Sequence, residues 1–437
     1  MTLSSSLNAG VAGLNVNSSK LGTISDNIAN SQTAGYKRAD TQFSSLVVTE
    51  SGGGKYAAGG VRATSFRQVD ARGGLITSEN PTDLAIGGRG LLPVTPVSSL
   101  NSADGALPVQ FVTTGSFRPD ENGVLTSASG QVLLGWPADR DGTILAFPRD
   151  NTNGLEPVQI SNGALVGSPT SKIGLGVNLP AQESRAGASG AALPLSIEYF
   201  DNLSATQSLD FTFTPTIPPT GASNQWTVEI SDSQSDPLSN PIESFLVDFD
   251  TTFAAGGSID NVATLTGTGT YDSNTGIYSF MTGGGPIELD IGKPGGNSGL
   301  TQLASEFGPT GITKDGSTAG SLSSIDVDEN GFVRGVFEGG FVRTLYQVPV
   351  ADFPNLNGMR ATDGQAFLAS PDSGAMFLWD AGDGPTGAVV SFAQEGSTSD
   401  IAAELTSLIT TQRAYSSNAT VIRTVDEMLQ ETTNIKR

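Results

Sequence analysis

The sequence contains no cysteine and no histidine. These absences exclude disulfide bonds, thiol nucleophiles, imidazole bases and the usual ligands of zinc and copper. A serine nucleophile would have no histidine to activate it, and no Gly-x-Ser-x-Gly pattern occurs in the chain. We therefore expect a protein that is not an enzyme, with no catalytic residues, no cofactor and no metal.

Basic residues are scarce. The chain has 22 Lys and Arg against 44 Asp and Glu, a net charge of -22. Nucleic-acid binding depends on clustered Lys and Arg, so this balance argues against a nucleic-acid partner. The same negative charge would keep the protein soluble at high concentration.

The chain also lacks a long apolar segment. No run reaches the roughly 18 to 20 residues that cross a bilayer. No basic residue precedes Lys20, and Gly10 and Gly13 interrupt any apolar core near the N-terminus. A secretory signal peptide needs a basic N-terminal region followed by an uninterrupted apolar core. We expect no membrane insertion and no cleaved signal peptide. If the protein leaves the cell, another route carries it.

Glycine and proline are abundant, at 55 and 23 residues, whereas only 15% of the 437 residues are charged. This composition is typical of turn-rich β structure. The length predicts about two to four compact units. Apolar and polar residues alternate at 193–201, 208–216 and 224–232, which predicts strands.

Both ends of the chain carry apolar residues spaced by seven, and this spacing predicts two helices that each present an apolar seam. We place Tyr415 among the packing residues rather than in a functional aromatic site. The seam residues are Leu7, Leu14, Leu21 and Ile28 at one end, and Ile401, Leu408, Tyr415, Ile422 and Leu429 at the other.

The ends of these helices have their own signals. Ser, Thr and Asp at 397–400 predict a cap for the C-terminal helix. Gly35 is expected to stop the N-terminal helix, with Lys37 and Arg38 near its negative end.

Two interpretations of the seams are open. Each helix lies on the protein's own core, or the helices pair with each other and with other subunits. Residues 1–34 contain only Lys20 and Asp26 as charges, and the remaining polar residues are small enough for close packing. The loss of backbone entropy on ordering an isolated terminal helix costs more free energy than burial of its seam side chains contributes. We therefore predict that the ends fold on assembly, pairing with each other and with neighbouring subunits.

Residues 116–125 and 324–333 resemble each other, and each places Asn-Gly between apolar residues, which predicts two β-hairpins. They flank the central region, so we predict one β domain built from two stretches, with a second domain inserted. The expected fold is α+β, mainly β, with a terminal α-helical coiled coil formed by both chain ends. The expected parts are the N-terminal helix 1–34, connecting segments 35–70 and 371–397, an inner β domain 71–144 and 286–370, an inserted outer β domain 145–285, and the C-terminal helix 398–437.

Residues 326–331 match the Asp-x-Asp-x-Asn-Gly opening of a calcium loop. The twelfth position is Phe337 instead of a bidentate Glu, and the flanks have the pattern of strands rather than helices. Asp, Asn and Gly are also preferred in tight turns. We favour a plain hairpin turn and keep calcium binding as the alternative.

Five segments resemble the flagellar rod, hook and hook-associated family. They are SDNIANSQTAGYKR (25–38), ITSENPTDLAIGGRG (76–90), TTGSFRPDENG (113–123), RTLYQVPVADFPNLNGM (343–359) and TTQRAYSSNATVIRTVDEMLQETTNIKR (410–437). The resemblance covers both ends and the split β domain, and it is weak in the insertion. The residues that carry the signature are Asn27, Asn30, Gly35, Tyr36, Arg413, Ala414 and Asp426.

The ending DEMLQETTNIKR and the large insertion are similar to the family's hook members, whereas rod subunits are generally shorter. The resemblance implies an extracellular subunit of the bacterial flagellum, exported by the flagellar type III apparatus. It also implies a helical homopolymer, a curved tube with helices inside and β domains outside that acts as a universal joint. The implied partners are the chain itself, the hook cap protein, the distal rod protein, the hook-filament junction protein and the export apparatus. Two alternatives remain: a rod or junction subunit, and a secreted β-rich adhesin or hydrolase whose heptads pack internally.

Overall fold

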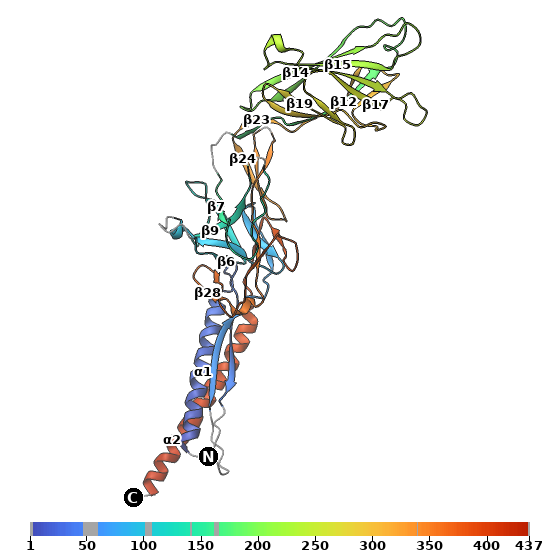
Figure 1. Ribbon diagram of the computed structural model, residues 1–437. Helices are drawn as coiled ribbons and strands as arrows, with labels where there is room; N and C mark the ends of the chain where they lie inside the picture. The colour runs from blue at the N-terminus through green and yellow to red at the C-terminus, as the bar shows by residue number, and fades with distance from the viewer. Residues whose placement is uncertain are drawn as a thin grey trace. The chain divides into compact units, whose positions relative to one another are not determined.

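The computed structural model describes residues 3–46, 60–100, 107–139, 142–160, 166–338 and 340–435. One long helix lies at each end of the chain, α1 (Leu3–Ala29) and α2 (Ile401–Ile435), with β strands between them (Figure 1). The predicted α+β, mainly β fold is confirmed. Within the described ranges, neither helix combines the length and the apolar content that a bilayer span requires.

The chain divides into two compact units. The first comprises Met1–Asn162, Ser324–Val336 and Val342–Arg437, and the second comprises Gly163–Ser323 and Phe337–Phe341. The second unit ends later than the predicted insertion at 285. It does so because β20 (Gly285–Asp290), β21 (Leu300–Leu303) and β22 (Gly308–Lys314) all pair with β12 (Lys172–Pro180). Strands that pair across more than a hundred residues leave no sign of that pairing in the local sequence.

The first unit is built on a 13-stranded sheet. Its main path runs β28 (Arg360–Ala361), β29 (Phe367–Leu368), β6 (Gln110–Val112), β5 (Leu92–Pro96), β9 (Gln131–Pro137), β8 (Leu125–Ser127), β7 (Thr114–Pro119), β4 (Asp83–Gly87) and β31 (Ala388–Val390). Four strands lie off this path: β10 (Glu156–Pro157), β24 (Leu322–Val327), β25 (Phe332–Phe337) and β26 (Val342–Gln347).

Three two-stranded antiparallel sheets and two short 3₁₀ helices complete the first unit. The core beneath them is centred on large buried residues such as Trp136, Phe353 and Phe367. The pairs are β1 (Ala39–Ser45) with β2 (Val61–Arg67), β3 (Leu75–Thr77) with β32 (Ala393–Glu395), and β27 (Val350–Asp352) with β30 (Phe377–Trp379), and the 3₁₀ helices are η1 (Val97–Ser99) and η3 (Leu356–Gly358).

Both predicted hairpins are present, as β7–β8 and β24–β25. In the second turn, Asp328 Oδ1 accepts hydrogen bonds from the backbone N–H groups of Asn330 (3.0 Å) and Phe332 (2.9 Å). Its Oδ2 lies 2.6 Å from Arg334 Nη2. The segment that matched a calcium loop therefore forms the favoured hairpin turn, and its central carboxylate is occupied by the turn and an arginine.

The second unit contains two larger sheets. One is an antiparallel sheet in the order β13 (Leu193–Phe200), β14 (Thr206–Pro215), β15 (Gln225–Asp232), β16 (Glu243–Phe249) and β17 (Ile259–Thr266). The three strands predicted from alternation are β13, β14 and β15, so that prediction is confirmed. The other sheet runs β18 (Thr270–Asp272), β19 (Ile277–Thr282), β20, β12 and β21, with β22 on β12. A short pair, β11 (Val166–Ser168) with β23 (Ser317–Gly320), and η2 (Pro237–Ser239) complete the unit.

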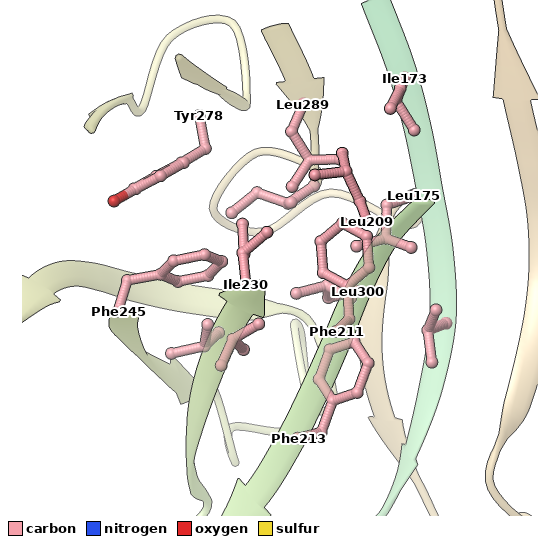
Figure 2. Packing of buried hydrophobic residues seen from close by; sticks show 14 of the residues in the cluster. Ile173, Leu175, Leu209, Phe211, Phe213, Ile230, Phe245, Tyr278, Leu289 and Leu300 are labelled. Atoms are coloured by element: carbon pink, nitrogen blue, oxygen red, sulfur yellow. The ribbon is translucent and has the colours of Figure 1, made fainter. Parts of the chain in front are cut away.

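A hydrophobic core joins the two sheets of the second unit (Figure 2). Leu209, Phe211 and Phe213 come from β14, while Leu175 and Leu289 come from the facing sheet. Successive residues of a strand point to opposite faces, so the alternating sequence places one face of β14 in this core. The unit is therefore a sandwich of two sheets.

Candidate assembly surface

The two terminal helices pack along each other in antiparallel directions. A side chain on Gly10 would meet Ile422, one on Gly13 would meet Asn418, and Asn27 contacts Glu404. Positions therefore rise along α1 as they fall along α2. Figure 1 shows the helices side by side. The predicted pairing of the two ends with each other is confirmed.

Two glycines of α1 allow this close packing. A Cβ atom on Gly13 would lie 2.8 Å from Asn418 Nδ2, and one on Gly10 would lie 3.0 Å from Ile422 Cγ1. Gly22 differs, because nothing would lie within 4 Å of its Cβ. Glycine disfavours helix formation, so Gly10 and Gly13 are explained by the approach of α2 rather than by local conformation.

The single chain covers the heptad seam only in part. Among the helix side chains that the structure describes, the buried hydrophobic residues lie elsewhere, at Val16, Ile24 and Val425. The polar residues Asn17 and Thr411 are also buried. Among the seam residues, Leu7, Leu14, Leu21, Ile28, Leu408 and Ile422 are half-buried, and Ile401, Tyr415 and Leu429 are exposed.

The first turns of α2 carry large aliphatic side chains that the chain leaves open. Ile401, Leu405 and Ile409 are 45%, 47% and 50% exposed. They are spaced by four residues, so they lie on one side of the helix. We call these three residues the open apolar face.

A polar cluster joins the C-terminal end of α1 to the start of α2. We call it the helix-base cluster, and it comprises Asn27, Tyr36, Lys37, Arg38, Glu395 and Glu404. Fully buried Asn27 donates to Ala39 O (2.8 Å) and to Glu404 Oε1 (3.1 Å), and its Oδ1 accepts from Ala39 N (2.8 Å). Arg38 Nε donates to the same Glu404 oxygen at 2.5 Å. One amide thus ties α1 to β1 and to α2.

Lys37 and Glu395 form the buried ion pair of this helix-base cluster. The Lys37 side chain is fully covered, and its Nζ lies 2.7 Å from Glu395 Oε1 and 2.6 Å from Ala71 O. Glu395 Oε1 also accepts from Gly73 N at 2.7 Å. Burial lowers the pKa of Lys37, and the charge of Glu395 opposes that shift. The pair links the chain just after α1 to the chain just before α2.

Tyr36 completes the cluster. Its hydroxyl lies 2.9 Å from Asp26 Oδ2 and 3.1 Å from Asn27 Oδ1, and the Arg67 guanidinium lies 4.9 Å from the ring centroid. Burial, aided by the hydrogen bond to Asp26, raises the pKa of Tyr36 to about 12. The phenol therefore stays neutral at physiological pH and donates to the carboxylate.

The end of α1 corrects one interpretation. The helix stops at Ala29 rather than next to Gly35, and Lys37 and Arg38 do not lie in its last turn. Their charges pair with Glu395 and Glu404 instead. A glycine at position 35 is still explained by backbone conformation, because its φ is +71°. Its N–H donates to the Glu395 carbonyl at 2.8 Å.

The start of α2 matches its predicted cap. Asp400 Oδ1 accepts from the N–H groups of Ala402 (2.8 Å) and Ala403 (3.2 Å), which satisfies two free donors of the first turn. That carboxylate also lies at the positive end of the helix dipole.

The remaining signature residues lie in two environments. Asn30 is half-buried, and its Nδ2 donates to Asp26 O (2.9 Å) and Asp26 Oδ1 (3.0 Å). Arg413, Ala414 and Asp426 are exposed on α2. Sequence reasoning missed Glu395 and Glu404, because their partners lie 358 and 366 positions away and no local pattern connects them.

The family models and the sequence relatives agree with one another. The family model "Flagella basal body rod protein" matches residues 7–37, and "Flagellar basal body rod FlgEFG protein C-terminal" matches residues 390–435. The chain is 31% identical to the flagellar hook protein FlgE of Rhizobium meliloti over 441 residues, and 33% identical to that of Brucella suis over 439 residues; each alignment covers 100% of both chains. The Escherichia coli hook protein is 26% identical over 441 residues, covering 98% of each. The crystal structure of Helicobacter pylori FlgE2 aligns at 15% identity with a TM-score of 0.48, covering 72% of this chain and 98% of that one.

Proposed function

The chain belongs to the flagellar hook protein family, and from that premise we propose that its subunits join through their terminal helices into a flexible curved tube. Members of this family are structural, so the chain is a structural subunit of the flagellar hook and not an enzyme. The relatives that match its whole length are named hook proteins, which favours a hook subunit over a rod or junction subunit.

The observation that carries the proposed joining surface is the open apolar face of α2. Three aliphatic side chains about half exposed on one side of a helix are costly to leave in water. Covering the exposed half of each would contribute roughly 0.7 to 1.5 kcal/mol. A second copy of the chain is the partner that a homopolymer supplies. Tyr415 and Leu429, the other exposed seam residues, add exposed apolar area farther along α2.

A tube joined in this way suits a universal joint. Each contact is modest, so a subunit can exchange one set of neighbours for another as a curved tube rotates. The helix-base cluster would keep both helices fixed to the β part of the first unit, and torque would pass from subunit to subunit through them. The hook cap, distal rod and junction proteins and the type III export apparatus are the further partners we propose.

The test compares purified wild-type protein with Leu405→Asp by sedimentation and electron microscopy. We expect tubes from the wild type and only monomers from the variant. Leu265→Asp is the matched control, because Leu265 is 55% exposed but lies on β17 of the second unit. Tubes from Leu405→Asp as abundant as those of the wild type would refute the proposed surface.

A further inference from the structure

We propose that Asn153 is a site of spontaneous covalent modification, at which the side-chain amide is lost through cyclisation onto the backbone of Gly154. The inference rests on the local structure of the first unit and is independent of the proposed assembly surface. It assigns a modification to the connection between β9 and β10, close to the core of the first unit.

The step needs no reagent besides water. The Gly154 backbone nitrogen attacks the Asn153 Cγ, so a new N–C bond forms while the bond from Cγ to the side-chain nitrogen breaks. The displaced nitrogen leaves as ammonia and carries away the proton of the Gly154 amide. Water then opens the five-membered ring at either carbonyl and gives an aspartyl or an isoaspartyl residue. The attacking nitrogen must be exposed and free of other hydrogen bonds, and a following glycine offers no Cβ obstruction.

The chain contains five Asn-Gly pairs, of which Asn162–Gly163 lies outside the described residues. In three of the other four, the glycine N–H is already bonded within its turn. The three bonds run from Gly123 to Asp120 O (2.9 Å), from Gly331 to Asp328 O (3.0 Å) and from Gly358 to Asn355 O (3.1 Å). Gly123 and Gly331 are also buried, and Gly358 is half-buried, so these nitrogens are shielded.

Asn153 and Gly154 are different in each respect. Both residues are exposed, and within the described part of the chain neither the Gly154 N–H nor the Asn153 side chain makes a hydrogen bond. They occupy the two central positions of a turn closed from Leu155 N to Thr152 O at 3.3 Å. The nucleophile and its target are therefore adjacent and open to water.

Packing explains why a glycine stands at this position. A Cβ atom on Gly154 would lie 2.3 Å from Cδ1 of Phe147, and the Gly154 φ of +83° suits glycine. The Phe147 ring itself stacks on Trp136 with centroids 5.9 Å apart. The requirement for glycine beside the ring leaves the reactive nitrogen unhindered.

Modification would act on the core of the first unit. Leu155 follows directly and is 7% exposed within the hydrophobic cluster. An isoaspartyl link places one additional carbon in the main chain directly before this buried leucine and its neighbour Gly154. We therefore expect aged protein to unfold more readily than fresh protein.

The experiment incubates full-length native protein at mildly alkaline pH and follows each Asn-Gly peptide by mass spectrometry with fragmentation that distinguishes isoaspartate. We expect Asn153 to react about tenfold faster than Asn122, Asn330 or Asn357. At those three sites the glycine N–H must first break its hydrogen bond, and the cost of one such bond sets the ratio. The same incubation in denaturant is the control, and there the four rates should converge. Asn153→Ala should remove the signal at that peptide alone.

Two outcomes would overturn the proposal. One is native reaction at Asn122 or Asn330 as fast as at Asn153. The other is an Asn153 that stays intact in the native protein while it reacts in denaturant. Either result would mean that the native turn protects this pair as well as it protects the others.

Discussion

Removing the charge of Lys37 should destabilise the first unit strongly. Replacing it with Met leaves the Glu395 carboxylate buried without its cation, and we expect a loss of roughly 3 to 5 kcal/mol of unfolding free energy in the first unit. Lys172→Met is the matched control, because the Lys172 and Glu288 side chains are 69% and 47% exposed. That change should cost less than about 1 kcal/mol. Denaturant unfolding of both variants measures the difference, and equal losses would contradict the role of the buried pair.

Tyr36 gives the same cluster a dependence on alkaline pH. Its pKa in the folded state is about 12, against 10.0 for an unperturbed tyrosine. The native state thus keeps the proton when the unfolded state has lost it, so this contribution to stability is complete below pH 10 and is lost as the pH rises towards 12. We expect Tyr36→Phe to remove this part of the alkaline destabilisation, with exposed Tyr415→Phe as control. Unfolding free energies across that pH range that fall alike in wild type and Tyr36→Phe would contradict the assignment.

These residues also show where sequence reasoning stops. Asn27, Gly35 and Tyr36 were found because they belong to a family signature, whereas Glu395 and Glu404 were not. A buried ion pair between distant segments has no periodicity and no spacing. Only the fold brings its members together.

At the scale of the helices, Gly13 tests whether close packing is required. We expect Gly13→Leu to push α2 away, at a cost of about 1 to 3 kcal/mol, because the added side chain meets Asn418. Gly22→Leu is the matched control. It places the same side chain on the same helix where nothing lies within 4 Å of the Cβ, and it should stabilise α1 slightly.

Hydrogen exchange of the α1 and α2 amides measures both variants. Gly13→Leu should accelerate exchange in both helices, whereas Gly22→Leu should not. Unchanged protection in Gly13→Leu would show that the two glycines do not determine the separation of the helices.

Elements with a strong local pattern were predictable from sequence. Alternation located β13, β14 and β15, and the heptads located both helices. The end of α1 was missed by several residues, because Asn30, Ser31 and Thr33 bond to the backbone or to each other in short turns after the last helical residue. Local capping of this kind competes with the helix but leaves the hydrophobic pattern unbroken.

At the scale of the whole molecule, net charge should govern the rate of assembly. Subunits with a net charge of -22 repel one another, and salt shortens the reach of that repulsion from about 30 Å at 0.01 M to about 8 Å at 0.15 M. We expect light scattering to show faster polymerisation of the wild type as salt rises through this range. Leu405→Asp should stay unassembled throughout. Slower wild-type growth at higher salt would mean that attraction between opposite charges, rather than apolar contact, dominates the joint.

The division into units marks the limit of the sequence at this scale. A split β domain with an insertion follows from the two similar hairpins, but the end of the insertion depends on β20, β21 and β22 returning to β12. Strands paired across more than a hundred residues are set by the packing of the complete sandwich.

The most direct measurement is electron microscopy of flagellar bases from a hookless mutant of the same bacterium that expresses either the wild-type chain or Leu408→Asp. Leu408 lies on the seam and is only half-buried by its own chain. It belongs to the first unit, so Leu408→Asp should leave the melting temperature of the second unit unchanged. We predict curved hooks with the wild type and bare rods with Leu408→Asp, although the folded variant is present. Hooks of normal length and curvature from Leu408→Asp would contradict assembly through the terminal helices.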